Sequence, residues 1–182
     1  MSAHRPHWSP LATRCPRPWR RWLLDRGSLT RRLQAQSEGR LTVQLLTQSW
    51  QRPRADEARA LGIPHCQLAL VREVLLQGHG QNWVYARSVL PRKAALGRMR
   101  HLHRLGTRPL GEWLFRHPNI QRGPILLTRW PAAHLPPPLL QSLAVPSPLW
   151  ARYSLFRYHQ DTLLVSEFFL PALPSLPVGQ DT

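Results

Sequence analysis

A glutamate and an arginine, each set among apolar residues, are the side chains of this sequence best placed to do chemistry. Glu167 lies in the run Leu163–Leu170, where the alternation of a strand would put it on one face with Leu163, Val165 and Phe169. Arg72 is the only charge on a second strand-like face, which it shares with Leu68, Leu70, Val74 and Leu76. A buried charge without a partner costs several kcal/mol, so each needs a counter-charge, hydrogen bonds or a change of protonation.

Three interpretations of this pattern stay open. Arg72 and Glu167 form a structural ion pair, or one of them lies at a strand end with its charge in water. The third interpretation is a small apolar pocket with a guanidinium at one end and a carboxyl at the other. Arg87 is a further candidate for an anion contact, on a strand face with Trp83, Tyr85 and Val89. Its amphipathic aromatic neighbours favour a half-exposed position at a pocket mouth at least as much as a buried one.

Composition limits the classes of protein and partner. A chain of 182 residues is long enough for one domain with one core. The net charge of +16 comes almost entirely from arginine, since Lys93 is the only lysine. Such a field concentrates small anions, and it would also favour loose adhesion to nucleic acid or anionic lipid. The arginines are scattered and no common recognition motif is present, so no specific nucleic-acid partner is expected.

Cysteine, histidine and hydropathy patterns point to a protein of the cytoplasm without a metal. Cys15 and Cys66 lack metal-ligand spacing and the density of a disulfide scaffold, which favours buried or incidental thiols in a reducing compartment. The nine histidines form no ligand cluster, because His101 and His103 do not share a helix face. No stretch resembles a secretory signal or reaches transmembrane length.

The pattern of elements predicts an α+β fold. Two hairpins are expected, from strands 68–76 and 83–90 and from strands 150–158 and 162–170, with further strands at 41–45 and 125–128. Helices are expected at 18–24, at 29–36 behind the N-cap Ser28, at 91–105 and at 109–116, while 52–61 fits a helix or a loop. Hairpins with interposed helices indicate an antiparallel sheet with helices on one side.

The same pass along the chain divides it into three parts. Residues 1–21 are expected to be a flexible basic segment, and residues 172–182 a loose tail. Residues 22–171 form a single domain, interrupted by a proline-rich excursion from the core at 130–148.

Six motifs in register resemble the chorismate pyruvate-lyase family, and the resemblance runs from about Trp22 to Pro171. Each motif is weak alone, but their shared order is specific. They are Trp22–Leu33, Leu70–Leu76, Ala86–Pro91, Leu105–Phe115, Leu149–Arg152 and Ser166–Pro171.

The resemblance implies a fold, a reaction and a site. Family members have an antiparallel sheet whose ligand is sealed beneath two helical flaps, here the segments 29–36 and 109–116. Arg72 would hold the ring carboxylate, helped by backbone groups near Leu110 and Leu29, and Glu167 would lie at the hydroxyl end of the ring. Leu29 stands where the family pattern has methionine, a change of similar volume. Arg87 is expected to serve as a second guanidinium, for the enolpyruvyl carboxylate.

The implied activity is elimination of pyruvate from chorismate to give 4-hydroxybenzoate, the first committed step of ubiquinone biosynthesis. It requires neither a metal nor an organic cofactor, and a monomer is expected. Two rival functions remain. One is a non-enzymatic sensor domain of the same fold for a small aromatic ligand, although the residues ahead of Trp22 are too few to encode a DNA-binding module. The other is a basic nucleic-acid-binding module, which would show a steep salt dependence.

Overall fold

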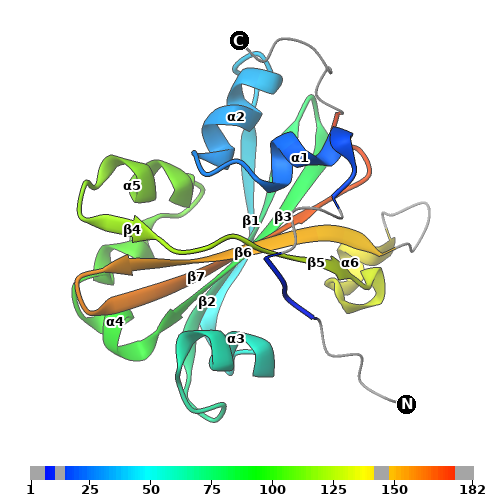
Figure 1. The fold of residues 1–182 in the computed structure, drawn as a ribbon. Coiled ribbons are helices and arrows are strands. Elements are labelled where there is room, and N and C mark those ends of the chain that lie inside the picture. The colour runs from blue at the N-terminus through cyan, green and yellow to red at the C-terminus, as the bar shows by residue number, and fades with distance from the viewer. Residues whose placement is uncertain (1–6, 11–14, 142–147, 175–182) are drawn as a thin grey trace.

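An antiparallel sheet of seven strands forms the centre of the molecule in a computed structural model, which describes residues 7–10, 15–141 and 148–174 (Figure 1). The strand order is β1-β2-β3-β7-β6-β4, and β5 also pairs with β6. Every pairing is antiparallel, which confirms the α+β class. The strands are β1 Thr42–Gln51, β2 Ala69–Gly78, β3 Gln81–Pro91, β4 Ile120–Arg122, β5 Leu126–Trp130, β6 Leu149–Tyr158 and β7 Asp161–Phe169.

Both predicted hairpins are present, and three of their four strands are longer than predicted. The β2–β3 turn consists of His79 and Gly80, which both have positive φ, at 52° and 75°. Two consecutive left-handed residues match the twist of an antiparallel pair, so the strands stay paired up to the turn. The β6–β7 turn likewise begins at His159, with φ of 55°. The short strand β4 was not predicted.

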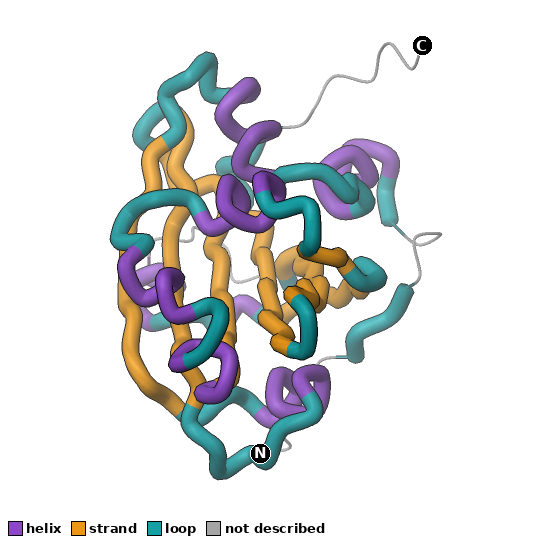
Figure 2. The backbone as a smooth tube through the Cα atoms, turned by 90° about the vertical axis from the view of Figure 1, so that its left-hand side faces the viewer, coloured by secondary structure: helices purple, strands orange, loops and turns teal. Residues whose placement is uncertain are grey.

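Helices α1 (Arg17–Leu23), α2 (Leu29–Gln36), α4 (Arg92–Leu96) and α5 (Leu110–Arg116) pack on one face of the sheet. Figure 2, seen from the side of α4 and α5, shows helices lying in front of the strands. The Ser28 side chain accepts a hydrogen bond from the Arg31 amide at 3.3 Å, which confirms the predicted N-cap of α2.

The continuous helix predicted for 91–105 is wrong. It breaks at Gly97 into α4 and a 3₁₀ helix, η2 (Arg100–Arg104). A Cβ at this position would lie 2.7 Å from the carbonyl oxygen of Lys93, so the chain can turn this tightly only at glycine.

Helices also cover the opposite face, which corrects the prediction that they lie on one side. Helix α3 (Ala55–Leu61) packs there against Val71, Val89 and Leu164. Helices η3 (Ala132–His134) and α6 (Pro137–Gln141) contribute Ala132 and Leu139, respectively, to a cluster with Tyr85 and Phe168. A sheet covered on both faces explains why its strands carry apolar residues on both.

All three segments predicted to lie outside the core contribute residues to it. In the N-terminal part, Cys15 is buried and Trp8 makes an edge-to-face contact with Tyr153. In the predicted tail, Leu173 is 6% exposed, and the Pro174 carbonyl accepts a hydrogen bond from the Trp22 indole at 3.1 Å. The proline-rich stretch is part of the core through Trp130, Leu135 and Leu139. Residues 1–6, 11–14, 142–147 and 175–182 lie outside the described residues.

A charged cluster is buried beneath α3. Arg87 is 7% exposed and donates to both oxygens of Glu57, at 2.7 and 3.1 Å, and to Glu73 at 2.5 Å. Arg54 lies 2.7 Å from Glu57, and the Tyr85 hydroxyl donates to Glu73 at 2.7 Å. Of the two positions left open for Arg87, the structure shows the buried one and excludes the half-exposed one at a pocket mouth, because two carboxylates hold its guanidinium on the face covered by α3.

Glu57 makes stability depend on pH. Burial raises the pKa of Glu57, but the charges of Arg54 and Arg87 outweigh burial and hold this pKa below its usual value. A lowered folded-state pKa adds stability above the unfolded pKa, and that stability is lost as pH falls through the folded pKa. We expect Glu57→Gln to lower the unfolding free energy at pH 7 by about 3 kcal/mol. Denaturant titrations should show a smaller loss of stability on acidification than in the wild type.

Glu38→Gln is the matched control for this variant. Glu38 pairs with Arg40 in solvent, and their side chains are 74% and 65% exposed. An exposed pair contributes little to stability, so this change should leave unfolding close to wild type. Equal stability of the Glu57→Gln and Glu38→Gln proteins at pH 7 would contradict the role given to the buried cluster.

Candidate active site

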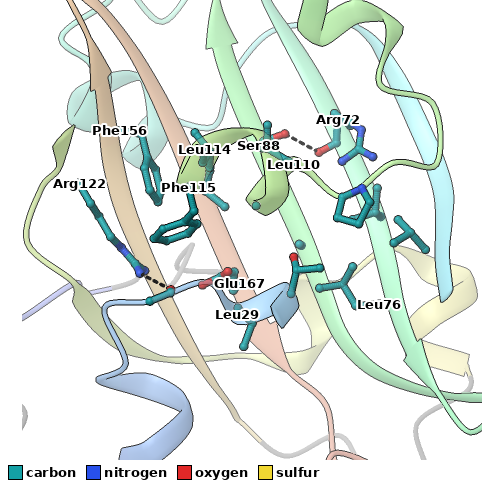
Figure 3. Close-up of a pocket in the computed structure, with 18 residues that line it drawn as sticks. Leu29, Arg72, Leu76, Ser88, Leu110, Leu114, Phe115, Arg122, Phe156 and Glu167 are labelled. Atoms are coloured by element: carbon teal, nitrogen blue, oxygen red, sulfur yellow. Dashed lines mark hydrogen bonds between the residues drawn. The ribbon is translucent and has the colours of Figure 1, made fainter. Parts of the chain in front are cut away.

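A cavity lies between the sheet and the two segments predicted as flaps, α2 and α5 (Figure 3). The space open to the centre of a water molecule is about 50 Å³, which is room for a few waters at about 10–15 Å³ each. A ligand with a six-membered ring therefore enters only if the flaps move. Most of the lining is apolar and includes Val74, Leu76, Leu114, Phe156 and Val165.

Arg72 supplies a positive charge at one end of this cavity. It is 5% exposed, and its Nη2 donates to the carbonyls of Gly106 at 2.9 Å and Arg108 at 3.1 Å. Its Nε is buried without a hydrogen-bond partner among the described residues. Burial lowers the pKa of Arg72 to about 10, so the guanidinium is still charged at neutral pH. A buried cation held only by neutral carbonyls is well suited to bind an anion.

Glu167 lies toward the other end, but its partner is not Arg72. Both residues line the cavity and lie well apart in it (Figure 3). Among the described residues no ion pair joins them, so the ion-pair interpretation is wrong, and the arrangement supports a pocket with a guanidinium toward one end and a carboxyl toward the other. Arg152, directly opposite Glu167 in the β6–β7 pairing, donates from Nε to Oε2 at 2.5 Å. Among the described residues none donates to Oε1, and Glu167 lines the cavity.

Arg152 was not among the predicted site residues, although the sequence carries a signal for it. It is 0% exposed, and its Nη1 donates to the carbonyls of Trp22 at 2.7 Å, Leu23 at 3.3 Å and Asp25 at 2.9 Å. On the alternating face of β6 it is the only charge beside Trp150, Ser154 and Phe156. This is the same pattern that identified Arg72.

Arg122 is a second arginine that was not among the predicted site residues, and for this one the sequence carries no pattern. It lines the cavity from β4, a strand of three residues that is too short for alternation to be visible. Its Nε donates to the Ser154 hydroxyl at 3.0 Å. Its Nη1 donates to the carbonyls of Asp25, Arg26 and Gly27 at 3.3, 3.0 and 3.2 Å. These bonds fix the guanidinium beside the segment that leads into α2.

The two flaps meet above the cavity. Leu29 on α2 and Leu110 on α5 are both buried and both line it. The flaps touch so closely that a Cβ at Gly111 would lie 2.8 Å from the Thr30 hydroxyl oxygen, and glycine allows this contact. The structure therefore brings four predicted site residues to one cavity, namely Leu29, Arg72, Leu110 and Glu167. Arg87 is not among them, because it lies on the opposite face of the sheet.

Two further features concern cofactors and membranes. Within the described ranges, no group of three or more His, Cys, Asp or Glu side chains is arranged to hold a metal ion. Cys15 and Cys66 are both free thiols. None of the helices in the described part of the chain is long and apolar enough to cross a membrane.

Comparison with solved structures shows how widely this fold occurs. The C-terminal domain of a histidine utilization repressor from Pseudomonas syringae superposes with a TM-score of 0.60 at 10% identity, covering 79% of this chain and 99% of that one. A transcriptional regulator of the GntR family from Bacillus cereus gives 0.55 at 10% identity, covering 78% and 99%. At such low identity these similarities show the fold alone.

Comparison of sequences is more specific. Residues 11–176 match the family model described as "Chorismate lyase". A protein of Chromohalobacter salexigens named "Probable chorismate pyruvate-lyase" is 45% identical over 171 residues, covering 92% of this chain and 90% of that protein. A protein of the same name from Thiobacillus denitrificans is 44% identical, covering 91% and 89%. The chain therefore belongs to the chorismate lyase family.

Proposed function

We propose that this protein eliminates pyruvate from chorismate to give 4-hydroxybenzoate, in the first committed step of ubiquinone biosynthesis. The observation that carries the proposal is the cavity beneath α2 and α5, with the Arg72 guanidinium at one end and the Glu167 carboxyl toward the other. Membership of the chorismate lyase family supports the same reaction.

The chemistry of chorismate indicates what such a cavity must do. The carbon–oxygen bond to the enolpyruvyl group breaks, and the carbon that bears the hydroxyl loses its hydrogen as a proton. The electron pair of that carbon–hydrogen bond completes the aromatic ring, while enolpyruvate takes up a proton and becomes pyruvate. Aromatisation supplies the driving force, so the protein needs mainly to orient the substrate and move a proton.

In this proposal Arg72 binds the ring carboxylate. A guanidinium can form two parallel hydrogen bonds to a carboxylate, which fixes both position and orientation. Arg72 Nη2 already donates to two carbonyls, and these bonds hold the side chain in place before a ligand arrives. We assign a supporting role to the backbone near Leu110 and Leu29, which close over the same cavity.

Glu167 takes the proton-transfer role. Fixing the ring carboxylate at Arg72 directs the hydroxyl and the ether oxygen, on the far side of the ring, toward Glu167. The carboxyl then exchanges a proton with the departing group or with the neighbouring hydroxyl. Arg152 is a positioning residue, because its hydrogen bond to Oε2 orients the carboxyl without touching the substrate.

The first experiment is to mix the purified protein with chorismate, without added metal or cofactor, and to follow the products by chromatography. We expect 4-hydroxybenzoate and pyruvate to appear in equimolar amounts. Tight binding of 4-hydroxybenzoate with no turnover would instead favour the sensor function, which the fold of the repressor domain allows.

Glu167→Gln tests the proton transfer. The amide keeps the size of the side chain and an oxygen for Arg152, but it cannot exchange a proton at neutral pH. We expect kcat to fall on the order of 10²-fold or more, with little change in the Kd of 4-hydroxybenzoate. Near-normal kcat would remove Glu167 from the mechanism. Glu38→Gln, on the exposed pair with Arg40, should turn over like the wild type.

We further propose that the protein acts as a monomer in the cytoplasm. Only five large apolar side chains are exposed among the described residues, two of them on β1 and the others on three further segments; they are Leu46, Trp50, Leu68, Leu96 and Phe115. Light scattering on the purified protein should give a mass close to 21.0 kDa. A mass twice as large would contradict the monomer.

A further inference from the structure

The cavity contains one more cation than a ligand with a single carboxylate can use. Chorismate carries two carboxylates, one on the ring and one on the enolpyruvyl group, whereas 4-hydroxybenzoate carries one. Arg87, the expected partner of the second carboxylate, lies on the opposite face with Glu57 and Glu73. Resting on the proposed function, we propose that Arg122 binds the enolpyruvyl carboxylate and so distinguishes substrate from product.

The position of Arg122 fits this role. It lines the cavity near Glu167, away from the end occupied by Arg72 (Figure 3). In chorismate the hydroxyl carbon is opposite the carboxyl-bearing carbon of the ring, and the enolpyruvyl ether is on the carbon next to it. A ring anchored at Arg72 therefore directs its ether toward the end where Glu167 and Arg122 lie.

The hydrogen bonds of Arg122 hold it in place and leave one edge unused. Its Nε is bound to Ser154 and its Nη1 to three backbone carbonyls. None of the hydrogen bonds among the described residues involves its Nη2. A guanidinium fixed on one side is pre-organised to donate to a carboxylate from the other side.

Charge supports the same conclusion. Within the described residues, no carboxylate lies within ion-pair distance of Arg122, and the nearby Asp25 carboxylate pairs with Arg32 instead. Burial lowers the pKa of Arg122 to about 10, although the charge of Glu167 acts in the opposite direction. The only carboxylate in the cavity wall, Glu167, is already bonded to Arg152. The cavity therefore presents two uncompensated cations, Arg72 and Arg122, which a dianion would neutralise.

This arrangement has a consequence for turnover. Cleavage of the ether separates the enolpyruvyl group and its carboxylate from the ring. The carboxylate leaves with pyruvate, so 4-hydroxybenzoate cannot use Arg122. The product loses one charge-assisted contact at the moment it forms. Arg122 thus strengthens the binding of chorismate without strengthening the binding of the product that must leave.

The test compares the two ligands in variants of Arg122. In a Glu167→Gln background, in which turnover should be slower on the order of 10²-fold or more, short titrations give the Kd of chorismate before much of it is consumed. We expect added Arg122→Met to weaken chorismate roughly 10- to 100-fold and 4-hydroxybenzoate less than about twofold. Arg72→Met is the matched control and should weaken both ligands. Arg122→Lys, which keeps the charge but loses the planar fork, should restore part of the chorismate affinity.

Two results would overturn the assignment. Equal weakening of both ligands would mean that Arg122 acts only by holding residues 25–27 and the flap behind them. Unchanged chorismate affinity would mean that the second carboxylate is bound elsewhere. Thermal unfolding of each variant, including Arg122→Lys, separates these results from a loss of folding. The proposed function fails separately, if the wild type releases no pyruvate from chorismate.

Discussion

The buried guanidinium of Arg152 is the contact on which the rest of the site depends. A completely buried cation needs hydrogen bonds and a counter-charge, and Arg152 finds them in two directions, while its Nη2 has no hydrogen-bond partner among the described residues. Nε binds the Glu167 carboxylate, and Nη1 binds carbonyls in the last turn of α1 and at Asp25. A helix leaves its last carbonyls without partners, so one side chain both completes α1 and orients the carboxyl of the cavity. Arg152 thereby joins β7, helix α1 and the segment that leads into α2.

Apart from Arg152, which pairs with Glu167, the buried arginines on the two faces of the sheet differ in whether a carboxylate balances their charge. On the face covered by α3, Arg54 and Arg87 meet Glu57 and Glu73, and the charges cancel within the protein. On the cavity face, Arg72 and Arg122 have carbonyl partners but no carboxylate among the described residues. Neutral carbonyls orient a guanidinium without cancelling its charge. The charges of Arg54 and Arg87 are thus balanced by carboxylates of the protein, whereas those of Arg72 and Arg122 are not balanced among the described residues.

The sequence was sufficient to predict those site residues that stand out in the alternation of side chains along a strand. Arg72 and Glu167 were each the single charge on an apolar strand face, and the structure places both on the cavity. Arg87 was misplaced because β3 is buried on both faces, so alternation separates its faces without telling which one lines the cavity. Arg152 had the same signal as Arg72, but nothing in the sequence showed that it lies opposite Glu167. The place of Arg122 in the cavity wall is visible only in the tertiary structure, because β4 is too short to show an alternating pattern.

The sheet fixes the distance between the two charged groups of the cavity, and the helices α2 and α5 cover it. Arg72 and Glu167 lie on β2 and β7, separated by β3, and in register they are offset by two residues. Two strand spacings across the sheet and two residues along it place their Cα atoms roughly 12 Å apart. Hydrogen-bonded strands keep this separation whether the flaps are open or shut. Leu29 and Leu110 line the cavity from the helices that cover it. Under the function proposed above, closure of these flaps would exclude water and so strengthen each charge contact inside the cavity. It would thereby turn two arginines held by carbonyls into a tight site for a dianion.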